Sequence, residues 1–372
     1  MEKRTGSIID LKALEENIKN LKNNLREGTK LAAVVKADAY GHGALEVSKA
    51  AIKSGADLLC FATAKETMEI LKEDISAPIL IMGPLMEDTL DLVVDFGVRQ
   101  CVFLKEHIEM LQKKAEEKNL EAYVHLKVDT GMNRIGIKDM DEFKELLDTM
   151  VRCDRVIFEG MFTHFAVSDE KDKSFSIMQA DRFGKFVSLA EEKGFKPVLH
   201  ACNSGAIIDL PQYGFDFVRA GISMYGYYPS DDVKKENVKL TPVMSVYTHI
   251  SHIKNIIPGE TVSYGRTFVA KDEMTVATLP IGYGDGFNRL LSDKGSVLVG
   301  GKRAKILGRV CMDMTVVDIS HIENVKIGDE VIVIGKQGDE TITADEHARI
   351  CGTISYEILL SFSSRVLREY RL

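Results

Sequence analysis

The chain has 372 residues, 45% of them hydrophobic and 28% charged, which predicts a globular protein of one large domain or two ordinary ones and excludes a disordered chain. A formal net charge of -8 without a block of basic residues argues against a nucleic-acid partner and favours a small ligand. Residues 1–7 lack the apolar stretch of a signal peptide, and no window approaches the roughly 18 apolar residues of a membrane span, so we expect a cytoplasmic protein that does not enter a membrane.

The first 235 residues alternate short β-rich runs with amphipathic stretches of helical period. A helix comes first, with Leu11, Leu14, Ile18, Leu21 and Leu25 on one face. Strand candidates follow at residues 31–37, 56–63, 78–83, 98–104, 121–129, 156–166, 197–203 and 215–222. Eight β/α units in about 230 residues predict a closed parallel (β/α)8 barrel. A doubly wound open sheet is the alternative, but no Gly-x-Gly-x-x-Gly fingerprint follows the first strand.

From about residue 240 onward, runs rich in Val, Ile and Thr alternate with tight turns such as Pro258-Gly259-Glu260 and Gly300-Gly301-Lys302. This pattern predicts an all-β domain. The polar, turn-rich stretch at 229–237 is the natural linker between the two parts. We therefore expect an α/β fold with a barrel domain over residues 1–235, followed by a mostly-β domain over residues 236–372.

The six cysteines are scattered through the chain, and no paired spacing suggests a disulfide framework or a zinc site. They are Cys60, Cys101, Cys153, Cys202, Cys311 and Cys351. His249 and His252 could suggest a metal pair, but residues three apart on a strand point to opposite faces. We therefore expect reduced core cysteines and no metal.

Lys36 stands between the apolar run at 31–35 and a glycine-rich turn at 40–43. An ammonium group there would be poorly solvated, which lowers its pKa and leaves the free amine that an aldehyde cofactor requires. From this position alone, a lysine that snorkels at a strand end is the alternative reading.

Other polar side chains also follow the ends of predicted strands, where barrel enzymes gather their catalytic groups. They are Lys127, Asp129 and Arg134 after the fifth strand, His164 after the sixth, Asn203 and Ser204 after the seventh, and Arg219 near the end of the eighth. Unrelated stabilising roles would have no reason to converge on one rim, so we expect a shared site.

Ser204 at a helix start and the amides of Gly221 and Ile222 form a candidate phosphate cradle, since barrels often bind phosphate at loops seven and eight. An isolated Ser-Gly pair would otherwise be a helix N-cap. A lysine amine combined with a phosphate cradle predicts pyridoxal phosphate as the cofactor.

With these residues the chain resembles the alanine racemases, fold type III pyridoxal phosphate enzymes, over essentially its whole length. The segments that carry the likeness are 33–43, 126–136, 162–166, 200–204, 218–222, 262–267, 282–286, 308–313 and 352–357. So many segments in the right order make a specific signal, whereas any one of them would be weak.

The resemblance implies that Lys36 holds the cofactor and moves protons on one face of the substrate's α-carbon. Tyr264, from a partner subunit in a homodimer with shared sites, is implied to act on the opposite face. Racemisation requires two such groups because a proton leaves one side of a planar carbon and another arrives from the other side. A tyrosine of ordinary pKa ~10 is a poor base at neutral pH, so His164 and Arg219 are its implied helpers.

Arg219 is also implied to donate a hydrogen bond to the cofactor's pyridine nitrogen and to leave that nitrogen unprotonated. This argues against the decarboxylases of the same fold, which place an acidic residue there. Arg134 is implied to bind the cofactor's phenolic oxygen and the substrate carboxylate, with help from Met312 of a partner subunit. Lys127 matches a position that carries a carbamate in many members, whose charge would hold Arg134. An ordinary strand-end lysine is the alternative for Lys127.

The remaining residues implied by the resemblance bind the cofactor or narrow the entrance. Tyr40, Asn203 and Tyr356 are assigned to the cofactor together with His164, Ser204, Gly221 and Ile222, and Tyr283, Tyr356 and Asp313 to the entrance. A tight entrance lined by tyrosines favours a methyl side chain, although small pockets discriminate weakly against one extra group. Asn133 stands where the family commonly has glycine.

The implied function is the racemisation of L-alanine and D-alanine, which supplies D-alanine for peptidoglycan. A racemase of broader specificity, or an amino acid decarboxylase on the same scaffold, is the first alternative. A non-catalytic protein that only binds pyridoxal phosphate is the second. Single-domain barrels of that kind resemble the first half of the chain but lack the β domain, and with it Tyr264 and Met312.

Overall fold

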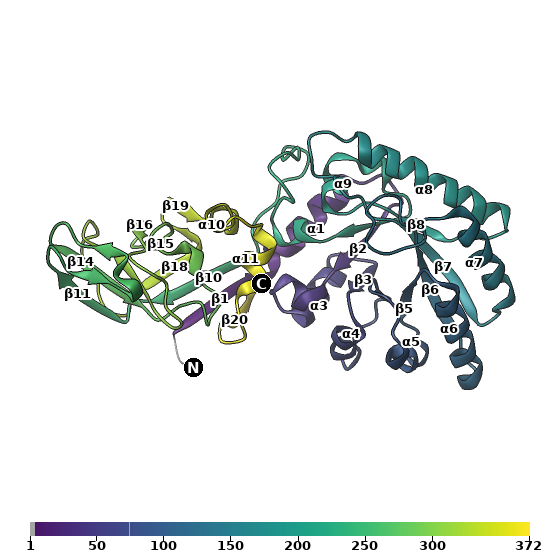
Figure 1. The fold of residues 1–372 in the computed structure, drawn as a ribbon, viewed down its shortest axis with the longest axis horizontal. Coiled ribbons are helices and arrows are strands. Elements are labelled where there is room, and N and C mark those ends of the chain that lie inside the picture. The colour runs from purple at the N-terminus through teal and green to yellow at the C-terminus, as the bar shows by residue number, and fades with distance from the viewer. Residues whose placement is uncertain (1–3, 74) are drawn as a thin grey trace. The chain divides into compact units, whose positions relative to one another are not determined.

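The computed structural model describes residues 4–73 and 75–372, which form two compact units. The barrel unit comprises Ala13–Ala39 and Ala44–Thr241. The β unit comprises the described part of Met1–Lys12, Tyr40–Gly43 and Pro242–Leu372. Figure 1 labels many of the helices and strands of each unit.

The barrel unit is built on a closed barrel of eight strands that pair in parallel in chain order, with the last strand returning to the first. The strands are β2 (Lys30–Val34), β3 (Leu58–Phe61), β4 (Ile79–Ile81), β5 (Arg99–Val102), β6 (Ala122–Lys127), β7 (Val156–Phe162), β8 (Val198–His200) and β9 (Phe217–Ala220). Each strand overlaps one of the eight ranges expected from the sequence, so the predicted barrel is confirmed.

Helices connect the strands and surround the barrel (Figure 1). They are α1 (Leu11–Asn23), α2 (Lys36–Tyr40), α3 (Ala44–Lys53), α4 (Ala64–Leu71), η1 (Glu87–Thr89), α5 (Leu90–Asp95), α6 (Lys105–Lys118), α7 (Met140–Arg152), α8 (Ser174–Glu192), α9 (Ser204–Asp209), η2 (Pro211–Tyr213) and η3 (Ile222–Tyr225). The predicted apolar face of α1 is buried, with Leu14, Ile18 and Leu21 at 0% exposure. Burial of apolar side chains is the main force that holds such a helix in place.

The β unit consists mostly of strands, as predicted. Its elements are β1 (Thr5–Asp10), β10 (Met244–His249), β11 (His252–Ile256), β12 (Thr261–Val262), η4 (Tyr264–Arg266), β13 (Phe268–Val269), β14 (Met274–Leu279), η5 (Arg289–Leu291), β15 (Ser296–Val299), β16 (Lys302–Lys305), β17 (Thr315–Asp318), β18 (Glu330–Gln337), β19 (Glu340–Ile342), α10 (Ala344–Cys351), α11 (Ser355–Ser361) and β20 (Leu367–Arg371). The largest sheet has the order β16-β15-β18-β10-β1-β20, with β19 on β18, and β11-β14-β17 and β12-β13 form smaller sheets.

The first strand of the chain belongs to the β unit, whereas we expected residues 1–235 to form the barrel domain. β1 pairs antiparallel with β10 and parallel with β20. In the register, Thr5 lies opposite Thr248 and Gly6 opposite Leu367. These partners lie more than 200 residues away along the chain, so no local pattern in residues 5–10 could reveal them.

The other division between the units falls between Thr241 and Pro242, a few residues after the expected boundary at 235/236. Asn17 of α1 holds Thr241 to the barrel unit. Its Nδ2 donates to the Thr241 carbonyl at 2.7 Å, and its Oδ1 accepts from the Thr241 N–H at 2.8 Å. Val233 and Val238 are buried, which keeps much of the expected linker on the barrel unit.

All six cysteines are free thiols, and four of them are buried, as expected for core residues. His249 ends β10 and His252 begins β11, so these two histidines lie on different strands rather than on one. Within residues 4–73 and 75–372, no group of three His, Cys, Asp or Glu side chains is placed to hold a metal ion. No helix in those ranges is long and apolar enough to cross a membrane.

Candidate active site

Lys36 begins α2, which is a left-handed turn just beyond the end of β2 and not an ordinary helix. The four residues that follow it, 37–40, have φ values of 52°, 52°, 53° and 55°. Left-handed backbone costs roughly 1–2 kcal/mol for each non-glycine residue, so the surroundings must hold this turn in place. One restraint is internal, because the Ala39 N–H donates to the Val35 carbonyl at 2.9 Å.

Glu66 provides a second restraint on the residue that follows Lys36. It lies in the first turn of α4, where it forms a capping box with Thr63. Its Oε1 accepts from the Ala37 N–H at 2.8 Å, and its Oε2 accepts from the N–H groups of Ala62 at 3.0 Å and Thr63 at 3.2 Å. One carboxylate therefore joins the start of α4 to the turn that begins at Lys36.

The Lys36 amine is half-buried, and burial lowers its pKa, as the preceding apolar run led us to expect. The positive charges of Arg134 and Arg219 lower that pKa further, while the Glu66 carboxylate opposes the change. The amine therefore loses its proton more readily than the amine of an exposed lysine.

Lys127 is a second desolvated lysine on the same unit, at the end of β6. Its Nζ donates to the Val128 carbonyl at 2.6 Å and lies 5.5 Å from the centre of the Phe162 ring. Burial lowers the pKa of Lys127 to about 8. This lysine is therefore not the ordinary exposed strand-end residue of the alternative reading.

Asp129 organises the loop that carries Arg134. Its carboxylate accepts from the N–H groups of Gly131 at 2.8 Å, Asn133 at 3.0 Å and Arg134 at 3.2 Å. Although burial raises the pKa of Asp129, these hydrogen bonds and the nearby Lys127 hold that pKa below its ordinary value. Asn133 has a φ of 53°, a conformation that asparagine tolerates better than most residues, and the Arg134 side chain is exposed.

Arg219 lies on β9 and is buried with its guanidinium among neutral acceptors. Nη1 donates to His200 Nδ1 at 2.8 Å and to the His200 carbonyl at 3.0 Å, and Nη2 donates to the carbonyls of Thr163 at 2.7 Å and Ala201 at 3.0 Å. Within the described part of the chain, no group accepts a hydrogen bond from Nε and no carboxylate pairs with Arg219. Burial lowers its pKa to about 10, so the guanidinium stays charged at neutral pH.

His164 follows β7 and lies between Arg219 and Asn203. Arg219 Nη2 is 3.4 Å from His164 Nδ1, and Asn203 Nδ2 is 3.5 Å from His164 Nε2. Burial and the nearby positive charges, Arg219 first, hold the pKa of His164 well below its ordinary value. The imidazole is therefore neutral at neutral pH, and each of its ring nitrogens faces a donor, Arg219 Nη2 at Nδ1 and the Asn203 amide at Nε2.

The residues expected to bind phosphate come together at the start of α9. Ser204 is its first residue, and Asn203 is the N-cap, whose side chain accepts from the Ala206 N–H at 3.2 Å. Ser204 Oγ accepts from the N–H groups of Gly221 at 3.0 Å and Ser223 at 3.3 Å. Ser204 and the segment from Gly221 to Ser223 thus gather hydroxyl and N–H donors, the groups that bind an anion.

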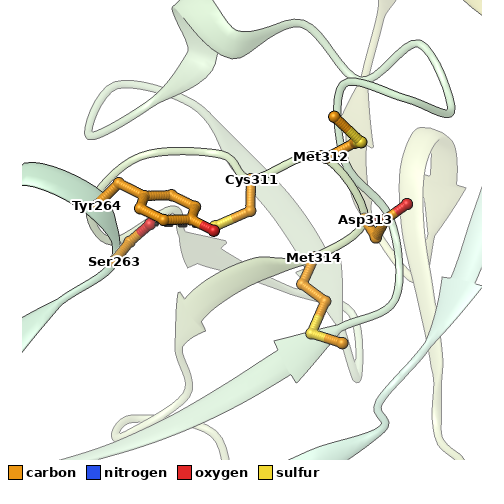
Figure 2. Close-up of a pocket in the computed structure, with 6 residues that line it drawn as sticks. All are labelled: Ser263, Tyr264, Cys311, Met312, Asp313 and Met314. Atoms are coloured by element: carbon orange, nitrogen blue, oxygen red, sulfur yellow. Dashed lines mark hydrogen bonds between the residues drawn. The ribbon is translucent and has the colours of Figure 1, made fainter.

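In the β unit, Tyr264 lies on a constrained turn and is 70% exposed. Ser263 before it has a φ of 64°, and its Oγ donates to the Arg309 carbonyl at 2.5 Å. Gly265 after it has a φ of 71°, and a Cβ there would meet the Arg309 guanidinium at 2.9 Å. Figure 2 shows the pocket lined by Ser263, Tyr264, Cys311, Met312, Asp313 and Met314, with the phenol ring directed toward Cys311.

The loop that carries Met312 is held against the loop that carries Tyr283. The Tyr283 N–H donates to the Cys311 carbonyl at 2.9 Å, and the Gly284 N–H donates to the Met312 carbonyl at 2.8 Å. Gly282 is required for this approach, because a Cβ there would meet the Cys311 carbonyl at 2.3 Å. Tyr283 and Met312 remain 43% and 52% exposed.

Asp285, which we did not single out from the sequence, anchors these loops. Its side chain is fully buried and accepts hydrogen bonds from the two terminal guanidinium nitrogens of Arg4, each at 3.0 Å. Arg365 lies 3.2 Å from the same carboxylate and 2.7 Å from Asp313. Paired charges of this kind satisfy the buried carboxylate and set the position of Asp313.

Tyr40 and Tyr356 lie side by side in the β unit, with ring centroids 5.9 Å apart and ring planes tilted by 49°. Tyr40 is buried at 8% exposure, and Tyr356 on α11 is half-buried. The structure thus pairs two tyrosines that lie over 300 residues apart in the sequence.

The predicted site residues fall into two sets, one within each unit. The barrel unit gathers Lys36, Lys127, Arg134, His164, Asn203, Ser204, Arg219, Gly221 and Ile222, and the β unit gathers Tyr40, Tyr264, Tyr283, Met312, Asp313 and Tyr356. Sequence reasoning missed the roles of Glu66, His200 and Asp285. A Thr-x-x-Glu capping pattern could have pointed to Glu66.

A closed barrel with desolvated lysines and a buried, charged arginine defines a class of α/β-barrel enzymes, here extended by a β domain. Family models for the alanine racemase N-terminal domain and C-terminal domain match residues 9–229 and 243–370. An alanine racemase from Clostridium perfringens (strain SM101 / Type A) is 42% identical over 98% of this chain and 94% of its own length. The chain belongs to the alanine racemase family.

Solved structures agree with this assignment. A structure of alanine racemase from Clostridium difficile 630 is 38% identical, with a TM-score of 0.94 over 100% of this chain and 96% of that one. A structure of alanine racemase from Bartonella henselae with covalently bound pyridoxal phosphate is 26% identical, with a TM-score of 0.89 over 99% of both chains.

Proposed function

We propose that this protein uses pyridoxal phosphate to interconvert L-alanine and D-alanine. Membership of the alanine racemase family supports the reaction class. The observation that carries the proposal is the pairing, on one rim, of a lysine whose amine readily loses its proton with a buried arginine whose Nε–H has no acceptor in the described part of the chain.

The residues of the barrel unit fit this cofactor. Lys36 supplies the amine that would hold it. Arg219 offers Nε–H as a donor for the ring nitrogen. Ser204, Gly221 and Ile222 would hold the phosphate end, with Asn203 beside Ser204 as the N-cap of α9.

The charge balance of the rim also fits an anionic ligand. The positive charges of Arg134 and Arg219 lower the pKa of Lys36 and of Lys127, whereas the carboxylates of Glu66 and Asp129 are occupied by backbone N–H donors. This surplus of positive charge favours a phosphate and a substrate carboxylate.

When bound, pyridoxal phosphate supplies an electron-withdrawing ring that stabilises negative charge at the substrate's α-carbon. Lys36 is the proton carrier on one face, because its lowered pKa leaves more of the amine free of its proton than in an exposed lysine. Arg134 binds the substrate carboxylate, and Asp129 fixes the loop that presents it.

Tyr264 of a partner subunit is the proposed proton carrier on the other face. At 70% exposure within one chain, this phenol has no desolvated environment of its own, and Met312 beside it is 52% exposed. A second copy that covers this surface would complete the site, which makes the protein a homodimer with shared active sites. His164, neutral and next to Arg219, is the proposed helper of the phenol.

We further propose that Lys127 carries a carbamate, since a lysine with a pKa of about 8 has enough free amine to react with CO2. The new negative charge would hold Arg134. Tyr283, Tyr356, Asp313 and Met312 would narrow the entrance and favour a methyl side chain. The proposed physiological role is the supply of D-alanine for peptidoglycan by a protein located in the cytoplasm.

The test is circular dichroism of reactions started from pure L-alanine or pure D-alanine. Separate reactions started from L-serine and L-lysine test these amino acids as alternative substrates. We expect optical activity to disappear from both alanine reactions and more slowly from the other two. Borohydride reduction should attach the cofactor to Lys36, as detected by peptide mass, and a Lys36→Ala variant should lack both label and activity. Loss of optical activity only with larger substrates would reject the alanine assignment, and evolution of CO2 would indicate a decarboxylase.

A further inference from the structure

A row of hydrogen bonds leads away from Arg219 through the interior of the barrel. Arg219 Nη1 lies 2.8 Å from His200 Nδ1, and His200 Nε2 lies 2.9 Å from His125 Nδ1. His125 Nε2 lies 3.1 Å from Glu159 Oε2. Both histidines are buried, with exposures of 0% and 2%, so the contacts of His200 with Arg219 and with His125 are shielded from water.

The row has one possible direction when both histidines are neutral. Burial lowers the pKa of each, and the charge of Arg219 lowers the pKa of His200 further. An arginine nitrogen can only donate, so His200 Nδ1 accepts and the His200 proton lies on Nε2. That proton is donated to His125 Nδ1, which places the His125 proton on Nε2, where it is donated to Glu159.

The backbone of β7 is adapted to this arrangement. Val124 on β6 pairs with Phe158, but the next residue, His125, pairs with Gly160, so Glu159 is the extra residue of a β-bulge. A bulge re-aims a side chain that would otherwise alternate with its neighbours. A Cβ at Gly160 would meet the His125 ring at 2.5 Å, so glycine is required where that ring lies.

The row ends on an ion pair. Arg99 on β5 donates from Nε and Nη2 to the two oxygens of Glu159, each at 2.8 Å. Although burial raises the pKa of Glu159, the hydrogen bond from His125 and the Arg99 guanidinium lower it to about 2. Glu159 is therefore an anion at neutral pH.

We propose that His200, His125 and Glu159 are positioning residues that orient Arg219 and polarise its hydrogen bonds. Glu159, which is paired with Arg99, acts on the buried guanidinium of Arg219 through two imidazoles and does not pair with it directly. Nη1 is then occupied by His200, and Nε–H is left for the ring nitrogen of the cofactor. The Glu159 carboxylate is kept away from that ring. The inference deepens the proposed function and rests on it for the identity of the group that Arg219 meets.

The row of hydrogen bonds from Arg219 through His200 and His125 to Glu159, called the relay below, predicts a specific magnetic resonance signature. In the full-length protein labelled with 15N-histidine and purified with its cofactor, His125 and His200 should both appear as Nε2–H tautomers with downfield imidazole protons, because each proton is held in a buried hydrogen bond. Glu159→Gln removes the charge and keeps the side-chain volume, so it should shift both resonances. Glu15→Gln is the matched control: Glu15 is 29% exposed, against 30% for Glu159, and pairs with Lys53 at 3.0 Å on a helix outside the relay.

Kinetics provide the second measurement. Glu159→Gln should lower kcat about tenfold with little change in KM, since networks of this kind usually modulate a distant site by factors of that order and the substrate carboxylate is bound elsewhere. In a His125→Gln background the same substitution should have no further effect, because the relay is already broken. Glu15→Gln should match the wild type.

If Glu159→Gln does not fold, His125→Gln tests the relay instead. It leaves the pair of Glu159 and Arg99 intact and should shift the His200 resonance. Nδ1–H tautomers, or equal spectra and rates for Glu159→Gln and Glu15→Gln, would overturn the relay. A wild-type protein that shows the expected tautomers but racemises no amino acid would refute the proposed function instead.

Discussion

Glu66 Oε1 accepts a hydrogen bond at 2.8 Å from the backbone N–H of Ala37, the residue directly after Lys36. The same carboxylate binds the N–H groups of Ala62 and Thr63 through its other oxygen. The start of α4 is thereby linked to the first residue of the left-handed turn. The non-glycine residues of that turn disfavour left-handed backbone, so the link helps to hold it.

Replacing Glu66 with Gln should loosen this turn. An amide has one oxygen, so it cannot accept from all three N–H groups, and we expect a loss of about 1–3 kcal/mol of stability. The pKa of Lys36 should fall further, because the Glu66 charge raises it. Thermal denaturation and the yield of borohydride-labelled Lys36 measure both effects. Glu69→Gln, on the exposed side of the same helix, is the control, and identical melting of the two variants would refute the link.

Lys127 should take up CO2 at a pH where an ordinary lysine is protonated. Burial lowers its pKa to about 8, so its free amine increases as the pH rises through about 8. Carbon-13 magnetic resonance with labelled bicarbonate should show a carbamate that is absent from Lys127→Gln and present in Lys138→Gln, a variant of an exposed lysine of the next loop. A signal that survives Lys127→Gln would assign the adduct elsewhere.

The same shift predicts how stability depends on pH when CO2 is excluded. The folded protein holds the Lys127 proton less tightly than the unfolded chain, whose lysines titrate near pKa ~10.4. The unfolded state therefore binds more protons between about pH 8 and 10.4, and stability rises with pH through that window. Chemical denaturation should show this rise in the wild type and a smaller one in Lys127→Met. Parallel pH profiles would contradict it.

Tyr264→Phe should slow proton removal from one enantiomer of alanine by at least the roughly 10²-fold typical of a lost acid or base. Folding should be unaffected, because the side chain is 70% exposed. The solvent isotope exchange rate of each enantiomer, followed separately, measures the asymmetry. Tyr370→Phe, a change at a 38% exposed tyrosine of the same unit, should leave both rates alone. Unchanged exchange in the Tyr264 variant would exclude it as a proton carrier.

Mixing two inactive variants should restore activity if each site draws on two chains. A dimer of one Lys36→Ala chain and one Tyr264→Phe chain would contain one site with both groups intact. Random pairing makes half of the dimers mixed, so co-expression should yield roughly a quarter of wild-type specific activity. Sites confined to single chains would give none.

Gly160→Ala should destabilise the barrel by about 1–3 kcal/mol, since the new methyl group would collide with the His125 ring. Gly184→Ala is the matched control, because nothing lies within 4 Å of a Cβ there. It lies within α8, so alanine should stabilise the helix by about 0.5–1 kcal/mol. Thermal denaturation distinguishes the two, and an unaltered melting point for Gly160→Ala would show that the ring moves aside freely.

The barrel could be predicted from the sequence because the period of apolar residues depends only on near neighbours. Each strand overlaps its expected range. The positions of Lys36, His164 and Arg219 at strand ends made them candidate site residues from the sequence alone. The lowered pKa of Lys36 could also be foreseen, since desolvation by residues 31–35 is local.

Pairing between distant segments had no such local signal. β1 lies between β10 and β20, and Tyr40 lies against Tyr356, contacts that join opposite ends of the chain. The left-handed turn after Lys36 contains no glycine at 37–40, so propensity argued against it.

The sequence by itself determined the β/α alternation, the change to short strands near residue 240 and the chemical groups at the strand ends, because these depend on side chains and their spacing. Tertiary structure alone decided how the groups act together. The bulge at Glu159 and the ring of His125 over Gly160 connect Arg219 to a carboxylate on another strand, and only the parallel pairing of β6, β7, β8 and β9 brings these side chains within hydrogen-bonding distance.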